Sequence, residues 1–130
     1  MSQDIIKGID VLLNEANKVV NTISIKKSKL IFKNNDYLFI DLRDYREILN
    51  EGKIPGSYSC PRGMLEFWID PNSQYFKEGK LDIQKEMVLF CAAGARSALA
   101  AKTLQDMGFD KVSHIEGGFG AIKTSDFKIS

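Results

Sequence analysis

The chain has 130 residues, of which 18 are basic and 17 acidic, and its formal net charge is +1. This length suits one domain with a sizeable core, and the balanced charge excludes a global field that would draw the chain to nucleic acid or a membrane. No apolar stretch approaches the ~20 residues that span a bilayer. The first four residues do not resemble a secretory signal. Two cysteines without framework spacing, Cys60 and Cys91, suit a reducing cytoplasm, where we expect the protein to work.

The first twenty residues carry an apolar stripe at helical spacing. Its members are Ile5, Ile9, Leu12, Ala16 and Val19. The stripe predicts a helix over about residues 3–20, within an N-terminal extension of residues 1–21. We expect this extension to pack on a main domain of residues 22–130; a docking face for a partner is the alternative.

A short extended piece is expected over residues 22–25, followed by a lysine-rich turn. The lysines of that turn are Lys26, Lys27, Lys29 and Lys33. A solvated face is the expected role of these lysines, and a docking patch for an acidic carrier is the alternative.

Strands and helices alternate along the rest of the chain. We predict strands at 37–40, 58–60, 87–90 and 111–115, helices at 44–50, 62–68 and 97–107, and a helical turn at 117–123. A further short helix is expected to start near residue 70 and run to 76. The alternation predicts an α/β fold, with a central parallel sheet of about five strands and helices on both faces. Ligands of such sheets bind beyond the carboxyl ends of the strands.

The segment Cys91-Ala92-Ala93-Gly94-Ala95-Arg96-Ser97, called the Cys91 loop below, follows one of these predicted strands and leads into a helix. Small side chains allow backbone N–H groups to turn toward the sulfur, and a helix N-terminus adds partial positive charge. Such surroundings lower the pKa of a thiol. Cys91 is therefore the predicted nucleophile; a small apolar residue that ends a strand is the alternative.

Four motifs, in this order, resemble those of rhodanese-like sulfurtransferases. They are Asp41-Leu42-Arg43 with Glu47, Gly52-Lys53-Ile54-Pro55-Gly56-Ser57, the Cys91 loop, and Glu116-Gly117-Gly118-Phe119. The segment from Pro61 to Trp68 resembles a bacterial single-domain subgroup with an extra N-terminal helix. The resemblance covers about residues 22–123 and implies a single rhodanese-like domain.

The resemblance implies a thiosulfate sulfurtransferase-like enzyme that works through a persulfide on Cys91, without cofactor or metal. A small sulfur donor and a thiol acceptor are the expected partners, with a protein persulfide as a further possible donor. The expected binding residues are the Cys91 loop members Ala92, Ala93, Gly94, Ala95, Arg96 and Ser97. Arg96 is expected to hold the oxyanion of the donor. Arg62 is a second candidate, with a surface ion pair to Glu66 as its alternative role.

Other polar residues are expected to support the site. In the family, the pair Asp41 and Arg43 fixes loops by charge-assisted hydrogen bonds, so both are expected to be structural. Cys60 is expected to be a packing residue, because no C-x-x-C pairing is present. His114 lies in a predicted strand and is not expected to be the base for Cys91, and a lone histidine makes no metal site.

Some residues depart from the family pattern. Lys53 replaces a usual histidine, Ile122 replaces a common tryptophan, and the Cys91 loop matches neither the mercaptopyruvate nor the thiosulfate form. The physiological donor, the acceptor and the oligomeric state are therefore left open.

Two other functions compete with sulfur transfer. One is a non-enzymatic persulfide carrier or regulatory module. The other is a cysteine-dependent phosphatase or arsenate reductase, which needs a C-x-x-x-x-x-R loop. Arg96 stands one position too early for that loop, and no acid–histidine pair leads into the cysteine.

Overall fold

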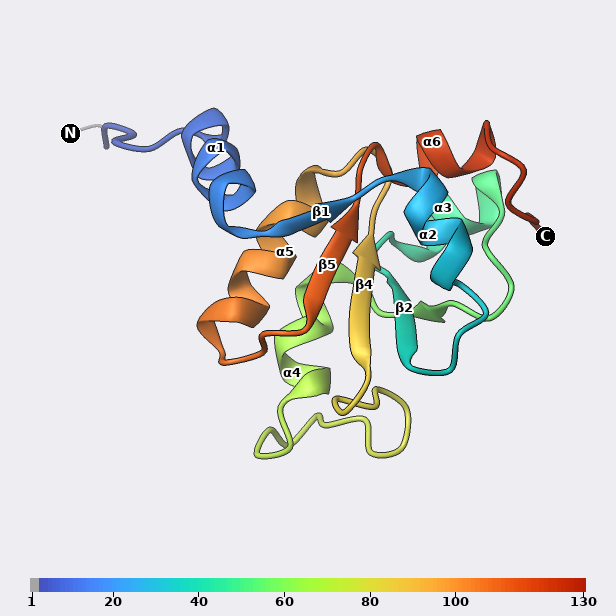
Figure 1. Ribbon diagram of the computed structural model, residues 1–130. Coiled ribbons are helices and arrows are strands. Elements are labelled where there is room, and N and C mark those ends of the chain that lie inside the picture. The colour runs from blue at the N-terminus through green and yellow to red at the C-terminus, as the bar shows by residue number, and fades with distance from the viewer. Residues whose placement is uncertain (1–2) are drawn as a thin grey trace.

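Five parallel strands form the centre of the protein in the order β1-β5-β4-β2-β3 (Figure 1). The computed structural model describes residues 3–130. The strands are β1 (Asn21–Ile23), β2 (Tyr37–Asp41), β3 (Tyr58–Ser59), β4 (Glu86–Phe90) and β5 (Val112–Ile115). The helices are α1 (Ile9–Val19), α2 (Ile25–Ile31), α3 (Tyr45–Glu51), α4 (Leu65–Ile69), α5 (Ala95–Asp106) and α6 (Gly118–Lys123), with a short 3₁₀ helix η1 (Arg62–Met64). The predicted parallel α/β sheet is confirmed.

Each face of the sheet carries its own apolar cluster, because successive side chains of a strand point to opposite faces. On one face, Met87 and Leu89 of β4 lie in a cluster with residues of α4 and α5. On the other face, Val88 and Phe90 lie in a cluster with residues of α2 and α6. Cys91 continues the alternation of β4 and belongs to the α5 face. The sheet therefore directs the predicted nucleophile toward the start of α5.

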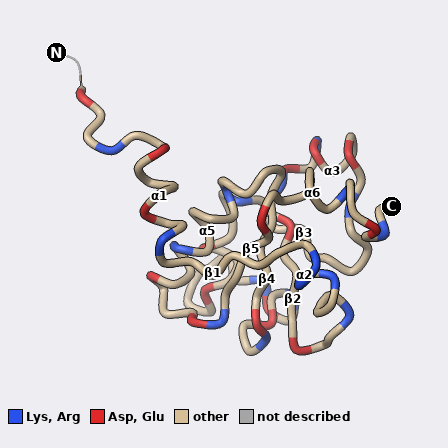
Figure 2. Tube along the Cα trace, turned by 45° about the horizontal axis from the view of Figure 1, so that its top comes forward, with Lys and Arg blue, Asp and Glu red and all other residues tan. Residues whose placement is uncertain are grey.

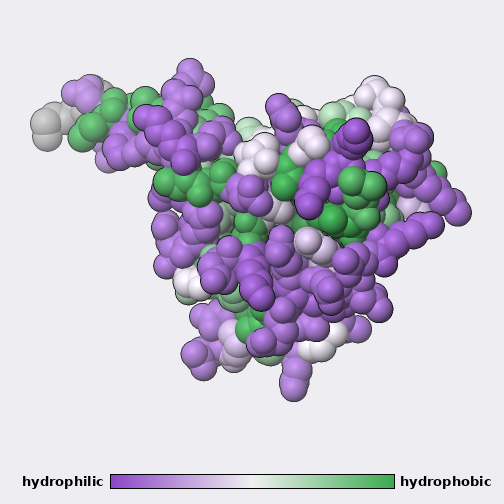
Figure 3. All heavy atoms as spheres, viewed as in Figure 1, coloured by the Kyte–Doolittle hydropathy of each residue, from purple (hydrophilic) through white to green (hydrophobic). Residues whose placement is uncertain are grey.

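The N-terminal helix is shorter than the sequence predicts. α1 begins at Ile9, and the two residues that start the predicted extension lie outside the described part of the chain. Ala16 is buried in the α1–α5 contact, and the Gln105 side-chain amide donates to the Val19 carbonyl over 3.0 Å. Most of the predicted stripe remains exposed, namely Ile5, Ile9, Leu12 and Val19. Figures 1 and 3 show this end projecting from the body, with apolar side chains on its surface.

The predicted lysine-rich turn is wrong, because residues 25–31 form helix α2. The Ser24 hydroxyl caps this helix by accepting from the Lys27 amide over 3.0 Å. Ser28 and Ile31 face the protein, while Lys26 and its lysine neighbours are exposed, as a solvated face requires. The sequence does not indicate this helix, because its buried face is narrow, partly polar and surrounded by lysines.

The predicted helix over residues 70–76 is also wrong. This segment consists of turns, in which the Asp70 carboxylate accepts from the Asn72 amide and the Ser73 hydroxyl accepts from the Tyr75 amide. Such local side-chain hydrogen bonds offer the backbone an alternative to a helix.

Charges of both signs are interspersed along the chain (Figure 2), in keeping with the small net charge. None of the helices within residues 3–130 is long and apolar enough to cross a membrane.

Candidate active site

The Cys91 loop places hydrogen-bond donors around the sulfur. The amides of Gly94 and Ser97 donate to Cys91 Sγ over 3.2 and 3.4 Å, and Ser97 Oγ lies 3.6 Å from the same atom. Gly94 has φ of +107°, a left-handed conformation that suits glycine and allows the chain to turn directly into α5. The side chains of Ala93 and Ala95 are exposed, so they do not crowd the sulfur.

These donors decide the ionisation of Cys91. Burial, which leaves the side chain 1% exposed, would raise the pKa of the thiol. The Ser97 hydroxyl and the amides of Ser97, Gly94 and Ala93 outweigh this effect, and the pKa of Cys91 is lowered. The loop therefore stabilises a thiolate.

The first turn of α6 holds the backbone of the Cys91 loop at Cys91 and Ala92. The amides of Phe119 and Gly120 donate to the carbonyls of Cys91 and Ala92 over 2.7 and 3.0 Å. In a trans peptide the N–H points opposite to the C=O. Because the Ala92 carbonyl faces α6, the next amide, that of Ala93, is turned toward the sulfur.

Only glycine fits at position 118. A Cβ atom there would lie 2.4 Å from the Cys91 carbonyl oxygen, and φ is +57°. The E-G-G-F motif is therefore a part of the Cys91 site, because it allows α6 to approach the loop backbone.

Arg96 has a partner that the sequence analysis did not link to it. Its guanidinium makes two hydrogen bonds to the Glu47 carboxylate, of 2.7 and 2.8 Å, so a donor oxyanion would share the guanidinium with Glu47. These bonds hold the pKa of Glu47 at about 2, well below its ordinary value, and raise that of Arg96. Glu47 also closes the capping box of α3 with Asp44. The cation beside the loop is thus fixed to α3.

Arg62 makes the ion pair to Glu66 that its i, i+4 spacing allows. Its guanidinium pairs with Glu66 over 2.7 Å and also donates to the Thr103 hydroxyl over 3.3 Å. These contacts tie η1 to α4 and α5.

Asp41 and Arg43 form a buried ion pair at the end of β2. The Arg43 Nε and Nη2 atoms donate to the two Asp41 oxygens over 3.0 and 2.8 Å, and Nη2 also donates to the Gly52 carbonyl. The guanidinium carbon lies 3.7 Å from the centre of the Phe119 ring. These contacts join β2, the Gly52 turn and α6.

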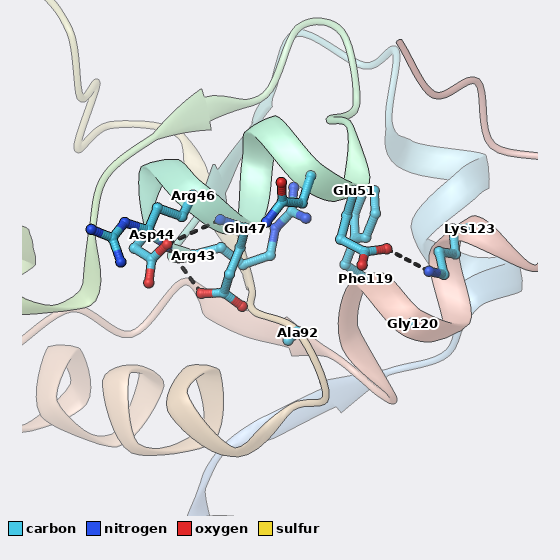
Figure 4. Close-up of a pocket in the computed structure, with 10 residues that line it drawn as sticks. Arg43, Asp44, Arg46, Glu47, Glu51, Ala92, Phe119, Gly120 and Lys123 are labelled. Atoms are coloured by element: carbon cyan, nitrogen blue, oxygen red, sulfur yellow. Dashed lines mark hydrogen bonds and ion pairs between the residues drawn. The ribbon is translucent and has the colours of Figure 1, made fainter.

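A pocket of about 380 Å³ adjoins the loop at Ala92 (Figure 4). Charged side chains of both signs line much of it: Arg43, Asp44, Arg46, Glu47, Glu51 and Lys123. Glu51 pairs with Lys123 across the pocket, joining α3 to α6.

His114 is a site residue that the sequence analysis missed. It is 3% exposed, and its Nδ1 atom lies 2.9 Å from Ser97 Oγ, while Nε2 lies 2.9 Å from Thr22 Oγ1. Its strand partner is Leu89, so the two side chains share a face of the sheet with Cys91. The alternation of side chains along β5 puts His114 on one face of the sheet, but only the register of β5 on β4 shows that this face is the one that carries Cys91.

Cys60 has no comparable donors. It is fully buried, its Sγ atom lies 3.8 Å from the Pro61 carbonyl oxygen, and burial raises its pKa to about 12. Both cysteines are free thiols. Within residues 3–130, no three side chains of histidine, cysteine, aspartate or glutamate are grouped so that they could hold a metal ion.

The family model of the rhodanese-like domain matches residues 24–125. The chain belongs to the rhodanese-like domain family. A mouse thiosulfate sulfurtransferase/rhodanese-like domain-containing protein 3 is 32% identical over 101 residues, which are 75% of this chain and 64% of the mouse protein. The tRNA uridine(34) hydroxylase of Escherichia fergusonii is 28% identical over 80% of this chain, but the match spans only 29% of that enzyme.

Solved structures agree with the rhodanese-like fold. A protein of unknown function from Rhodopseudomonas palustris, described as a possible tyrosine phosphatase, is 50% identical with a TM-score of 0.92, covering 100% of this chain and 99% of that one. A rhodanese-related protein from Thermoplasma volcanium has a TM-score of 0.67 at 23% identity, covering 85% of this chain and 97% of that one, and so supports the fold alone.

Proposed function

We propose that this rhodanese-like protein is a sulfurtransferase that carries a sulfane sulfur on Cys91. The observation that carries the proposal is the pair of backbone N–H groups, from Gly94 and Ser97, that donate to the Cys91 sulfur, with the Ser97 hydroxyl 3.6 Å from the same atom. A buried packing thiol has no need of such donors, whereas a nucleophilic thiolate and an anionic persulfide both do.

The reaction is a pair of displacements at sulfur. The Cys91 thiolate attacks the outer sulfur of the donor and forms an S–S bond, and the donor leaves with the electron pair as a sulfur oxyanion or a thiolate. An acceptor nucleophile, a thiolate or cyanide, then attacks the terminal sulfur of the persulfide. The S–S bond breaks, and Cys91 returns as a thiolate.

The donor is a small sulfane compound of the thiosulfate type or a protein persulfide. Because the cysteine side chain is 1% exposed, the donor has to present its sulfur at the end of a narrow group. The reaction needs neither a nucleic acid nor a membrane as a partner. Both thiols are free, which suits the reducing cytoplasm.

Phosphate ester hydrolysis is a second candidate, because a relative at 50% identity is described as a possible tyrosine phosphatase. Two features argue against it. The loop places Arg96 five positions after Cys91, and the guanidinium is engaged by Glu47. An arginine in this position does not surround a tetrahedral oxyanion.

A turnover assay with purified protein tests the proposal. Thiosulfate and a small organic persulfide serve as donors, cyanide as acceptor, and thiocyanate is measured. We expect turnover by the parent and by Cys60→Ser, and none by Cys91→Ser. Hydrolysis of an aryl phosphate that depends on Cys91, without thiocyanate formation, would overturn the proposal in favour of a phosphatase.

The same assay separates an enzyme from a carrier. A carrier accepts one sulfur per chain from a persulfide donor but does not turn over with small donors and cyanide. We expect many turnovers per chain; a single stoichiometric transfer would contradict the enzyme and support the carrier.

A further inference from the structure

A chain of hydrogen-bonding groups leads from the exposed Thr22, on the edge strand of the sheet, through the buried His114 and Ser97 to the active sulfur. Thr22 Oγ1 of β1 lies 2.9 Å from His114 Nε2, and His114 Nδ1 lies 2.9 Å from Ser97 Oγ. Ser97 Oγ lies 3.6 Å from Cys91 Sγ. The sulfur-transfer scheme above gives no task to His114 or Thr22.

The direction of the protons in this chain decides what reaches the sulfur. The Ser97 hydroxyl has one proton and can use it toward Cys91 Sγ, His114 Nδ1 or the Gly94 carbonyl, which is 3.2 Å away. If Nδ1 carries a proton, it donates to Ser97 Oγ, and the serine cannot donate to the ring. The serine proton is then available for the thiolate. The Thr22 hydroxyl completes the pattern by donating to Nε2.

We propose that His114 is a positioning residue that aims the Ser97 hydroxyl at the Cys91 sulfur and thereby stabilises the thiolate and the persulfide. This inference rests on the proposed function of Cys91. In the arrangement that follows, every hydroxyl proton from Thr22 to Ser97 points toward the sulfur.

The surroundings of His114 keep the arrangement neutral and in place. Burial lowers the pKa of the imidazole, with the Glu116 carboxylate at the end of β5 opposing the shift. A neutral ring has one N–H; with that proton on Nδ1, the ring donates to Ser97 Oγ and Nε2 accepts from the Thr22 hydroxyl. The ring therefore adds a directed donor to the site without adding a net charge.

Two substitutions of similar size separate this role from mere packing. The side-chain amide of His114→Asn replaces the Nδ1–H group and can still donate to Ser97. The longer side chain of His114→Gln places its amide near the Nε2 position and cannot. We measure the Cys91 pKa from the ultraviolet absorbance of the thiolate; Cys60, with a pKa of about 12, does not interfere in the neutral range.

We expect His114→Gln to raise the pKa of Cys91 by about one unit, or tenfold in thiolate stability, and His114→Asn to leave it close to the parent value. In a Ser97→Ala background, His114→Gln should have no further effect, because the hydroxyl that it positions is gone. Equal shifts for the two histidine variants, no shift in either, or a full shift in the Ser97→Ala background would each overturn the inference.

The titration uses no sulfur donor, so it is independent of turnover. A parent protein that fails to form thiocyanate, but shows the expected pattern of pKa values, would refute the proposed function and leave the positioning role of His114 standing. Turnover by the parent with an unchanged Cys91 pKa in His114→Gln would support the proposed function and refute the positioning role of His114.

Discussion

Cys60 and Cys91 both follow strands of the same sheet, and their side chains are 0% and 1% exposed. Burial raises the pKa of Cys60 to about 12, whereas the pKa of Cys91 is lowered in spite of burial. The difference lies in the backbone that follows each cysteine. Pro61 after Cys60 has no N–H to offer and presents a carbonyl to the thiol, while the Cys91 loop returns amides and a hydroxyl to its sulfur. Exposure alone therefore does not tell an inert thiol from a nucleophile.

The largest expected effect is on the ionisation of the two thiols themselves. With a pKa near 12 for Cys60 and below 9.0 for Cys91, their thiolate fractions at about pH 7 differ by at least a factor of about a thousand. Ultraviolet titration of Cys60→Ser should show one thiol that ionises below the ordinary range of a cysteine. Titration of Cys91→Ser should show none there. Similar titration curves for the two variants would show that Cys60 and Cys91 do not differ in pKa.

The next effect concerns the backbone that shapes the loop. Gly118→Ala places a Cβ atom 2.4 Å from the Cys91 carbonyl oxygen at a φ of +57°. The strain alone costs about 1–3 kcal/mol, and displacement of α6 should also raise the pKa of Cys91. Denaturant unfolding and thiolate titration measure both effects.

Gly63→Ala is the control for that substitution, because a Cβ atom at residue 63 meets nothing within 4 Å. It should leave stability and the Cys91 pKa nearly unchanged. If Gly118→Ala behaves like Gly63→Ala, α6 does not shape the loop.

A smaller shift is expected when one donor is removed. Ser97→Ala deletes the hydroxyl near Sγ but keeps the amide, so Cys91 becomes more like Cys60. A hydrogen bond to a charged group is worth about 1.5–3 kcal/mol, or about one to two pKa units upward. Ser113→Ala is the control, because Ser113 is buried like Ser97 but points to the face of the sheet opposite to His114, its neighbour in β5. An unchanged pKa in Ser97→Ala would leave the amides as the sole cause.

The smallest effect should come from the partly exposed pair of Glu47 and Arg96. The pKa of Glu47 is about 2 in the folded protein and 4.5 ordinarily, so the pair adds stability above about pH 4.5 and loses it as the pH falls toward 2. Because both side chains reach solvent, we expect Glu47→Gln to cost less than about 1 kcal/mol. Urea unfolding at near-neutral and acidic pH measures it; the deficit should vanish in acid. A deficit that persists unchanged in acid would show that the pair is not its cause.

Local sequence predicted the sheet and the Cys91 loop well, because both depend on neighbouring residues. The apolar run before Cys91 gives β4, and Gly94 allows the turn into α5. α2 was missed because its buried face consists of little more than Ser28 and Ile31 among lysines.

The remaining features depend on residues far apart in the chain. The Glu47–Arg96 pair joins positions 49 residues apart, and the Ser97–His114 contact needs the register of β5 on β4. The periodicity of a single helix or strand relates only residues of that element, so it cannot predict either contact. The sequence analysis therefore contains neither the Glu47–Arg96 pair nor the Ser97–His114 contact.

The central claim is that Cys91 carries the transferred sulfur, and peptide mapping by mass spectrometry tests it most directly. The parent protein is treated with thiosulfate or with a small organic persulfide and digested without reductant. A second sample is treated with cyanide after the donor, and the two digests are compared. We predict the added mass of one sulfur atom on the Cys91 peptide, removed by cyanide and absent from the Cys60 peptide. An adduct on Cys60, or none on Cys91 with either donor, would contradict the claim.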